Sequence, residues 1–485
     1  MLDFGPGILD ARGFTSHSAF EDHYLRIANF LISRGVKAGD SVALLMRNCS
    51  PFIEATAAVQ HLGAYPVPLN WHLMPAEISY VLEDCEARLL IADADLLAPL
   101  TDLPPPLELV SIDADRMIWK ELLAAHYPIR TAPAAAVQSM IYTSGTTGKP
   151  KGVRHQPPAP PEAETIRQMR SDLYGLRANM RGLLAAPMYH SAPNFFALSI
   201  VRGGGLLVLQ SHFDARQTLD AIERFGISHS FMVPTMFVRL LALSEAERCR
   251  YDLSTLQHVL HAGAPCPADI KSAMIDWWGP VLFEYYGSTE MGPLTFCTSA
   301  DSRAKPGTVG KPLQGIELTI RDEQGSRCAA GVAGDIFVAT TIQPDFTYHR
   351  APEKREEVSH GDEMITGDIG YQDDDGYLFI CGRRTDMIIS GGTNIYPAEI
   401  ESALHTISGI MDCAVFGLPD EEFGESVFAA IQLEQGCSLT KEQILKELES
   451  KIAKYKLPRK MKFYESLPRD ESGKIYKRRL RETFI

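Results

Sequence analysis

The segment Tyr142-Thr143-Ser144-Gly145-Thr146-Thr147-Gly148-Lys149-Pro150-Lys151-Gly152 follows residues 137–141, whose apolar character predicts a buried strand. Its glycines let backbone N–H groups approach an anion closely, while its hydroxyl side chains add donors and its two lysines add positive charge. A loop of this composition directly after a strand predicts a polyphosphate site. It is not a Walker A loop, because Gly145 and Gly148 are too close together and Pro150 follows the first lysine.

Strand-like and helix-like segments alternate along the chain on both sides of this loop. This rhythm predicts a layered α/β core with a mainly parallel sheet. The predicted strands are residues 41–46, 65–69, 87–92, 204–209, 227–233 and 257–261, and the predicted helices in the first part are residues 51–63 and 76–83.

The length of the chain predicts more than one domain, because 485 residues exceed what a single core normally holds. A short polar piece, Cys381–Asp386, interrupts the pattern late in the sequence. We therefore expect a large N-terminal domain of layered α/β subdomains at residues 1–381 and a hinge at residues 382–386. A small α+β domain follows at residues 387–485, with helices near residues 397–405 and 441–455.

The charge balance disfavours nucleic acid as the main partner. Acidic residues outnumber basic ones by 61 to 47, and the net charge of −14 repels phosphate backbones and anionic membrane surfaces. Basic residues dominate locally in residues 451–485, where a phosphorylated ligand remains compatible with the sequence. The scattered cysteines suit a reducing compartment, and we find neither a signal sequence nor an apolar run of about 18 residues. We expect a cytoplasmic protein with no integral membrane segment.

The glycine- and threonine-rich loop resembles the phosphate-binding signature of the adenylate-forming superfamily, which contains acyl-CoA synthetases, firefly-type luciferases and peptide-synthetase adenylation domains. Segments similar to other signatures of that superfamily follow in the same order as far as residue 474. The resemblance implies a small C-terminal domain that is mobile, and it implies ATP, Mg²⁺ and coenzyme A as cofactors. It is strongest to fatty-acyl or aryl-CoA ligases, which form an acyl-adenylate with release of pyrophosphate and then a thioester.

The resemblance also assigns roles around the nucleotide. Glu290 is similar to the residue that holds Mg²⁺, and a hard cation on a carboxylate would neutralise charge on the leaving pyrophosphate. Asp368 resembles the carboxylate that accepts hydrogen bonds from the ribose. The other residues implied are a phosphate ligand, Thr289; the adenine neighbours Tyr286 and Gly287, the glycine leaving room for the base; the loop residues Thr143, Ser144, Gly145, Thr146, Thr147, Gly148, Lys149 and Lys151; and Gly263, Ala264 and Arg383.

The C-terminal domain carries two further matches. Lys474, within Ser472-Gly473-Lys474, is similar to the lysine that catalyses adenylation by bridging the substrate carboxylate and the α-phosphate. Gly391 and Gly392 resemble residues that line a tunnel for the pantetheine arm after the domain rotates. Two positions depart from the superfamily pattern: Thr385 replaces the usual Asp or Lys of the hinge, and residues 361–364 lack a Gly-Trp pair.

The segment around His190 predicts the nature of the acid. Within Pro187-Met188-Tyr189-His190, the histidine resembles a residue beside the substrate carboxylate, and its neighbours are apolar. Residues 188–197 contain neither an acidic residue nor an arginine, which disfavours an amino acid or a dicarboxylate. We expect a hydrophobic monocarboxylate, which is fatty, aromatic or steroid-like.

Three hypotheses remain open at this point. The first is an acyl-CoA synthetase, and the second is an adenylating enzyme that loads the thiol of a carrier protein. The third is a non-catalytic nucleotide-binding protein of the same fold, which the two departures from the pattern would favour. The oligomeric state is equally open, with a homodimer among the options.

Overall fold

The computed structural model describes residues 2, 4–113, 116–134, 137–143, 150–391, 393–434, 436–469, 475 and 477–484. None of the helices in these ranges is both long enough and apolar enough to cross a membrane.

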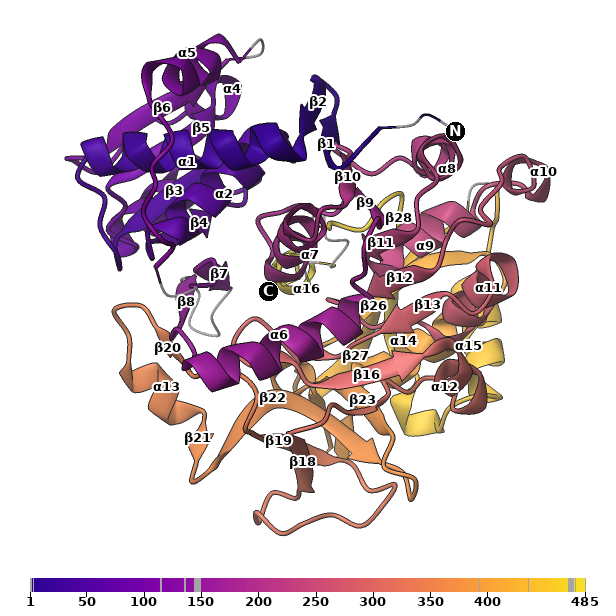
Figure 1. The fold of residues 1–485 in the computed structure, drawn as a ribbon. Coiled ribbons are helices and arrows are strands. Elements are labelled where there is room, and N and C mark those ends of the chain that lie inside the picture. The colour runs from indigo at the N-terminus through magenta and orange to yellow at the C-terminus, as the bar shows by residue number, and fades with distance from the viewer. Residues whose placement is uncertain are drawn as a thin grey trace.

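The N-terminal region contains a parallel sheet with the strand order β4-β3-β5-β6 (Figure 1). The prediction of alternating strands and helices is confirmed here, because the three apolar runs expected as strands at residues 41–46, 65–69 and 87–92 all lie in this sheet. Its strands are β3 (Ser41–Leu45), β4 (Tyr65–Pro68), β5 (Leu89–Asp93) and β6 (Glu108–Ile112), and the helices of this region are α1 (His17–Ser33), α2 (Ser50–His61), α3 (Pro75–Asp84), α4 (Ala94–Leu97) and α5 (Met117–Ala125).

The largest sheet has the strand order β17-β16-β13-β12-β11-β9-β10-β1-β2, and its centre is parallel. It shares one continuous apolar core with the first sheet. Its strands are β1 (Gly7–Asp10), β2 (Gly13–Ser16), β9 (Arg181–Leu184), β10 (Leu206–Leu209), β11 (His229–Met232), β12 (His258–His261), β13 (Leu282–Glu284), β16 (Thr295–Thr298) and β17 (Lys311–Pro312), and the helices of this part are α6 (Pro160–Tyr174), α7 (Ser191–Arg202), α8 (Ala215–Phe225), α9 (Pro234–Leu241), α10 (Glu245–Arg248), α11 (Ala268–Trp278) and α12 (Ser299–Ala304).

Smaller antiparallel sheets complete the large domain. One has the order β18-β19-β22-β21, with β23 paired to β22, and another has the order β20-β8-β7. The bounds are β7 (Ile141–Thr143), β8 (Lys151–His155), β14 (Gly287–Ser288), β15 (Gly292–Pro293), β18 (Ile316–Arg321), β19 (Gly334–Thr340), β20 (Phe346–Tyr348), β21 (Ser359–His360), β22 (Glu363–Gln372), β23 (Leu378–Arg383) and the helix α13 (Glu353–Glu357).

The strand expected at residues 137–141 is displaced along the chain. Val137 and Met140 are buried in the apolar cluster beside β4, as the sequence suggested, but the ladder begins only at Ile141. The reason is the partner strand, since β8 pairs with residues 141–143 and so fixes where the strand lies.

The C-terminal domain is a separate α+β unit, drawn in orange and yellow in Figure 1. Its sheet has the order β25-β24-β27-β26, with β28 beside β27, and it has its own apolar core. The helix expected at residues 441–455 is shorter in the structure and ends at Glu449. The elements are β24 (Ile388–Ser390), β25 (Thr393–Ile395), α14 (Pro397–His405), β26 (Ile410–Asp420), β27 (Gly424–Leu433), α15 (Lys441–Glu449), the 3₁₀ turn η2 (Lys454–Lys456), β28 (Lys460–Tyr464) and α16 (Lys477–Glu482).

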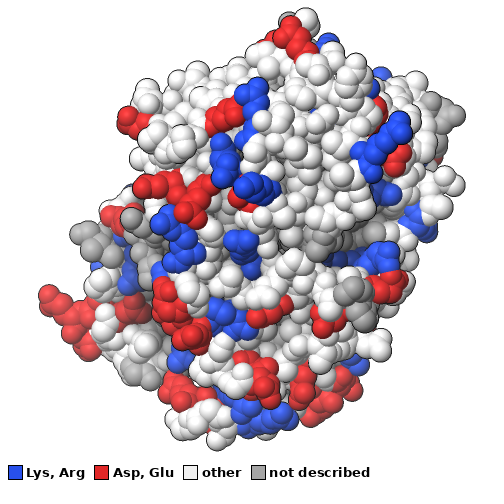
Figure 2. Space-filling view, turned by 60° about the vertical axis from the view of Figure 1, so that its left-hand side comes forward, with Lys and Arg blue, Asp and Glu red and all other residues white. Residues whose placement is uncertain are grey.

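The connection between the two domains is a 3₁₀ turn, η1 (Arg384–Asp386), between strands that belong to different sheets. Arg384 forms an ion pair with Asp335 on β19. The domain limits at residues 381 and 387, with the hinge between them, remain a prediction. On the face that Figure 2 shows, basic and acidic side chains are interspersed over much of the surface.

Candidate active site

The two ends of the glycine- and threonine-rich loop are held opposite each other. Strands β7 and β8 pair antiparallel, so that Thr143 faces Lys151. Gly152 is required here, because a Cβ atom at this position would lie 2.9 Å from the ring of Tyr142. The loop residues Ser144, Gly145, Thr146, Thr147, Gly148 and Lys149 lie outside the described residues.

The carboxylate of Glu290 lies beside this loop. Its Oε1 atom accepts hydrogen bonds from Thr143 Oγ1 and from Tyr348 OH, each 3.3 Å long. Among the described residues, no hydrogen bond reaches Oε2. Two neutral donors therefore orient the carboxylate without neutralising it, and an oriented carboxylate oxygen suits a hard divalent cation such as Mg²⁺.

The backbone at Glu290 is fixed from behind by His155. Burial lowers the pKa of this histidine to about 4, so the ring is neutral near pH 7. Nε2 lies 3.0 Å from the carbonyl oxygen of Glu290 and must carry the proton of this hydrogen bond, since a carbonyl only accepts. The turn between β14 and β15 is thus anchored to the end of β8.

Two lysines meet next to Glu290. Lys151 Nζ lies 5.2 Å from the centroid of the Tyr348 ring. Burial lowers the pKa of Lys151, and the adjacent Lys354 on α13 lowers it further, against the opposing charges of Glu357 and Glu290. Two ammonium groups that lie close together favour an anion between them. This arrangement suits a polyphosphate.

A second cluster joins three residues that were predicted to bind the nucleoside. Tyr286 OH donates a hydrogen bond of 2.6 Å to Asp368 Oδ2, and Arg383 Nε lies 2.9 Å from Oδ1 of the same carboxylate. Asp368 is 7% exposed. No pattern in the sequence indicates the contacts among the three side chains, but these contacts fit a single binding site for the nucleoside.

Gly287 is required by the hairpin that carries Glu290, and its expected role beside the adenine stays a prediction. A Cβ atom there would lie 2.1 Å from the carbonyl oxygen of Gly292, because β14 and β15 pair closely, with Gly287 opposite Pro293. The glycine therefore closes the hairpin that carries Glu290. Thr289 lies in the turn of this hairpin and is partly buried.

His190 directly precedes α7, and its ring lies 4.5 Å from that of Tyr189. The preceding segment is held by the buried amide of Asn48, whose Oδ1 accepts from Met188 N at 3.0 Å and whose Nδ2 donates to the carbonyl oxygen of Ala186 at 2.9 Å.

The predicted site residues that follow β12, and those in the C-terminal domain, are only partly described. Gly263 is exposed, with a φ of +90°, and Ala264 is partly buried just after β12. Gly391 is exposed between β24 and β25, and its N–H donates to the carbonyl oxygen of Phe423 at 2.8 Å. Gly392 and Lys474 lie outside the described residues.

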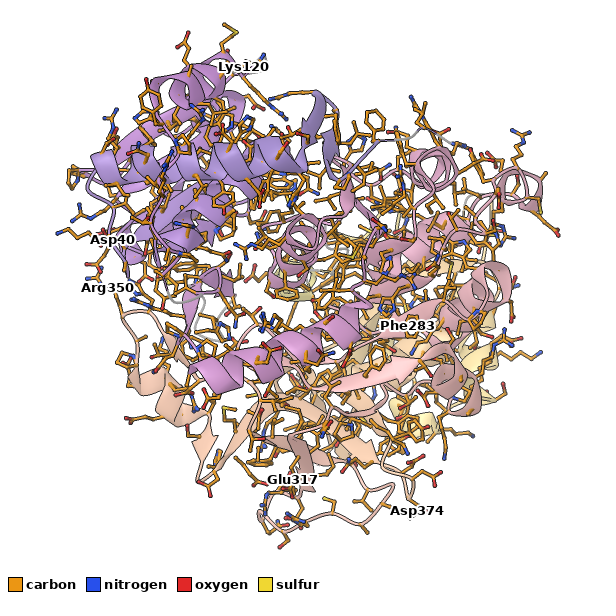
Figure 3. The ribbon with its side chains drawn as sticks, viewed as in Figure 1. Asp40, Lys120, Phe283, Glu317, Arg350 and Asp374 are labelled. Carbon is orange, nitrogen blue, oxygen red and sulfur yellow. The ribbon has the colours of Figure 1, made fainter. Side chains whose placement is uncertain are left out.

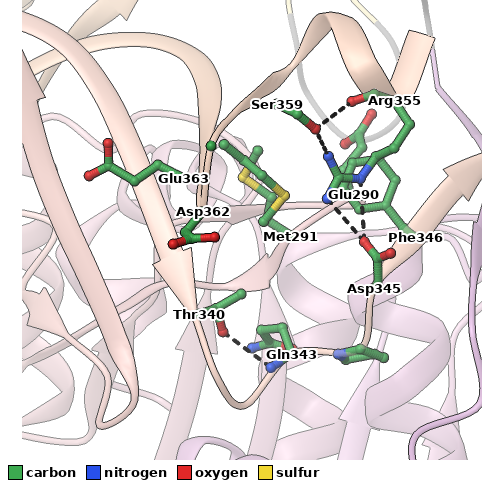
Figure 4. A pocket seen from close by; sticks show the side chains of 13 residues that line it. Glu290, Met291, Thr340, Gln343, Asp345, Phe346, Arg355, Ser359, Asp362 and Glu363 are labelled. Carbon is green, nitrogen blue, oxygen red and sulfur yellow. Dashed lines mark hydrogen bonds and ion pairs between the residues drawn. The ribbon is translucent and has the colours of Figure 1, made fainter. Parts of the chain in front are cut away.

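A cavity of about 220 Å³ opens beside Glu290 and Met291 (Figure 4). Charged groups dominate part of its lining, where Arg355 binds Asp345 at 3.0 Å. A wall of this kind does not suit an apolar acyl chain. The ion pair between Arg355 and Asp345 does hold α13 in place, and this helix also carries Lys354, next to Arg355.

Sequence reasoning missed three of these side chains, namely His155, Tyr348 and Lys354. His155 lies on β8 and contacts the turn that carries Glu290. Tyr348 reaches Glu290 because β20 pairs with β8, and α13, which carries Lys354, follows β20 in the chain. Nothing in their local sequence signals this pairing, which joins strands that lie far apart in the chain.

Comparison with known families agrees with this geometry. A family model described as AMP-binding enzyme matches residues 8–342, and a model described as AMP-binding enzyme C-terminal domain matches residues 399–474. The chain belongs to the AMP-binding, adenylate-forming enzymes. The family includes coenzyme A ligases, which use ATP, Mg²⁺ and coenzyme A.

Three similar proteins place the chain within these enzymes. A feruloyl-CoA synthase from Amycolatopsis sp. is 33% identical over 95% of this chain and 92% of its own length. The fatty acid–[acyl-carrier-protein] ligase ScoC from Streptomyces coeruleorubidus is 31% identical over 95% of this chain and 89% of its own length. The structure of ATP-bound MatB from Rhodopseudomonas palustris superimposes with a TM-score of 0.86 at 28% identity, covering 100% of this chain and 97% of that one.

Proposed function

We propose that this adenylate-forming enzyme is an acid–thiol ligase that acts on a carboxylic acid with a hydrophobic body. It converts the acid to an acyl-adenylate with ATP and Mg²⁺, releases pyrophosphate, and transfers the acyl group to coenzyme A. The observation that carries the proposal is the contact between Glu290 and Thr143, which sets a carboxylate at the base of the predicted phosphate loop.

In the first step, a substrate carboxylate oxygen attacks the α-phosphorus of ATP, and the bond to the β-phosphate oxygen breaks. Glu290 is the residue that would hold Mg²⁺, which supplies charge neutralisation on the leaving pyrophosphate. Lys151 and Lys354 add positive charge, and Asp368 holds the ribose. Lys474 is proposed to offset the repulsion between the two reacting anions.

In the second step, the thiol of coenzyme A displaces AMP from the acyl-adenylate. We propose that the C-terminal domain turns about residues 382–386 between the steps and brings Gly391 and Gly392 to the active site. The exposed position of Gly391, between two short strands, supports this role. The ion pair between Arg384 and Asp335 would hold one of the two arrangements.

A second candidate is transfer of the acyl group to the thiol of a carrier protein. It is favoured by the similarity to the ScoC ligase, whose name describes that reaction. Both candidates share the first step and differ only in the thiol that accepts the acyl group.

The experiment supplies ATP, Mg²⁺ and a panel of hydrophobic acids, and measures pyrophosphate and AMP with and without coenzyme A. We expect coenzyme A to increase AMP release and an acyl-CoA to appear. Transfer to a phosphopantetheinylated carrier protein, with none to coenzyme A, would establish the second candidate instead. ATP binding without pyrophosphate release from any acid would reject both and leave a nucleotide-binding protein.

A further inference from the structure

A group of five aromatic residues, which we call the aromatic cluster, lies between α6, α7 and the ends of β11 and β13. Its ring centroids are separated by 5.0 Å for Tyr174 and Phe195 and by 6.4 Å for Tyr174 and Tyr285. Phe196 links the cluster to β11, with 6.4 Å to Phe231. Phe195 and Tyr285 are partly exposed, whereas the other three members are buried.

The cluster adjoins two residues that we place at the reaction centre. His190 immediately precedes α7, the helix that carries Phe195 and Phe196. Tyr285 immediately precedes Tyr286, which holds Asp368. An acyl group that extends from the reacting carboxylate along α7 would therefore meet these rings.

Arg170 lies against the cluster and brings a positive charge to it. It stands one turn before Tyr174 on α6, and its guanidinium carbon lies 4.6 Å from the centroid of the Phe195 ring. Burial lowers the pKa of Arg170, and the only opposing influences come from Tyr174 and Tyr285. Within the described residues, no carboxylate lies within ion-pair distance of this guanidinium.

A partly buried guanidinium destabilises the folded chain unless a hydrogen-bond acceptor replaces the water it has lost. Partly burying a guanidinium removes hydration from its five N–H donors, and contact with the Phe195 ring supplies no hydrogen bond to replace it. By contrast, the largely buried Arg116 has the carboxylate of Asp10 as its partner. Arg170 therefore has donors to offer a ligand.

We propose that Arg170 is a specificity-determining residue that binds an acceptor oxygen, best a second carboxylate, at the end of the substrate acid remote from the reacting carboxylate. The inference rests on the proposed acid-activating function. The acid then has an apolar body, which the aromatic cluster contacts, and a polar far end. A planar guanidinium binds a carboxylate through two parallel hydrogen bonds, which gives geometric selectivity as well as affinity.

The proposal changes one expectation from the sequence. A dicarboxylate was disfavoured because residues 188–197 contain no arginine. The fold supplies the missing charge from α6, a different segment, by packing Arg170 onto Phe195.

The test uses matched pairs of acids that differ only at the far end. Suitable pairs are 3-phenylpropanoic acid with 3-(4-carboxyphenyl)propanoic acid, and butanoic acid with succinic acid. The value of kcat/KM for pyrophosphate release is measured for each acid, and the preference is the ratio within a pair. We expect the natural chain to prefer the acceptor-bearing acid of at least one pair by about tenfold or more.

The variants are Arg170→Gln and Arg170→Lys, with Arg224→Gln as the control. Arg224 also lies over a phenylalanine, at 5.2 Å from Phe225, but it is exposed on α8. We expect Arg170→Gln to reduce the preference to about one, Arg170→Lys to keep part of it through the retained charge, and Arg224→Gln to keep all of it. Thermal melting of each variant in the presence of each acid gives a second readout, in which only the acceptor-bearing acid loses its stabilising effect.

Two results would overturn the proposal. One is a natural chain that activates acids but shows no preference within any pair. The other is an Arg170→Gln variant that loses activity on both members of a pair equally, which would make the arginine a packing residue. Absence of pyrophosphate release with every acid would instead reject the proposed function itself, together with this inference.

Discussion

The hydroxyl group of Tyr286 lies 2.6 Å from Oδ2 of Asp368, although 82 positions separate the two residues in the chain. Burial raises the pKa of Tyr286 well above that of an ordinary tyrosine, so the phenol stays protonated and donates. Arg383 holds the other carboxylate oxygen. The carboxylate is therefore oriented before any nucleotide arrives, which reduces the entropic cost of binding one.

Replacing this carboxylate should weaken ATP binding. We expect Asp368→Ala to raise KM for ATP by about tenfold to a hundredfold, because a charge-assisted hydrogen bond is lost. Tyr286→Phe should have a smaller effect in the same direction, since the ring remains. Initial rates of pyrophosphate release at varied ATP check this. Asp374→Ala, in an exposed turn (Figure 3), is the control, and an unchanged KM for Asp368→Ala would remove the nucleoside assignment.

The Mg²⁺ requirement tests Glu290. Glu290→Gln keeps the size of the side chain but removes the charge, so we expect the Mg²⁺ concentration for half-maximal rate to rise by about tenfold or more. Tyr348→Phe removes only one of the two hydrogen bonds that orient the carboxylate and should shift the curve less. A titration of adenylation rate against Mg²⁺ measures both, and coincident curves for the natural chain and Glu290→Gln would contradict the metal assignment.

The pair of lysines should hold pyrophosphate. We expect Lys354→Ala to weaken product inhibition by pyrophosphate by about threefold to tenfold, because one charge-assisted contact is lost, while Lys354→Arg retains most of it. The inhibition constant of pyrophosphate, measured at varied ATP, tests this expectation. Lys120→Ala removes the same charge from the exposed face of α5 (Figure 3) and should have no effect. Equal inhibition constants for Lys354→Ala and the natural chain would assign this residue to packing alone.

Local patterns predicted the elements but not their contacts. The strands at Ser41–Leu45 and Leu206–Leu209 follow from short, mainly apolar runs, which are typical of strands in a buried parallel sheet. The meeting of Glu290 with Tyr348 depends on the pairing of β8 with β20, which no local pattern specifies. Arg170 was overlooked for the same reason, because its contact with Phe195 depends on how α6 packs against α7.

The two half-reactions should separate at Lys474. We expect Lys474→Ala to lower adenylation by about a hundredfold or more, because the residue is proposed to act only in that transition state. Thioester formation from a presynthesised acyl-adenylate and coenzyme A should stay within about twofold, since the lysine has by then left the site in the proposed rotation. Single-turnover measurements of each step distinguish them. An equal loss in both steps would argue against the rotation.

A buried ion pair beneath the site should control stability and its dependence on pH. Lys271 on α11 is 2% exposed and Glu284 on β13 is 4% exposed, and they pair directly, with Lys271 Nζ also 3.0 Å from the carbonyl oxygen of Thr308. β13 ends just before Tyr285 and Tyr286, so the pair supports the nucleoside site. Lys271→Met leaves the carboxylate buried without a cationic partner, because His261, whose Nδ1 lies 4.0 Å from Glu284 Oε1, has its pKa lowered by burial and is neutral. We expect a loss of about 3–5 kcal/mol in the free energy of unfolding.

The pH dependence follows from the remaining group. Burial raises the pKa of Glu284, and without Lys271 it should rise further. A carboxyl group whose pKa is raised in the folded state favours folding at low pH and loses that contribution as the pH rises through the folded value. The free energy of unfolding that Lys271→Met costs should therefore be smaller near pH 5 than near pH 8. Urea unfolding at the two pH values measures this difference. The double variant Lys271→Met, Glu284→Leu should recover most of the stability and lose the pH difference, because neither charge remains. A double variant that is no more stable than the single one would mean that packing around Lys271, and not the orphaned charge, sets the cost.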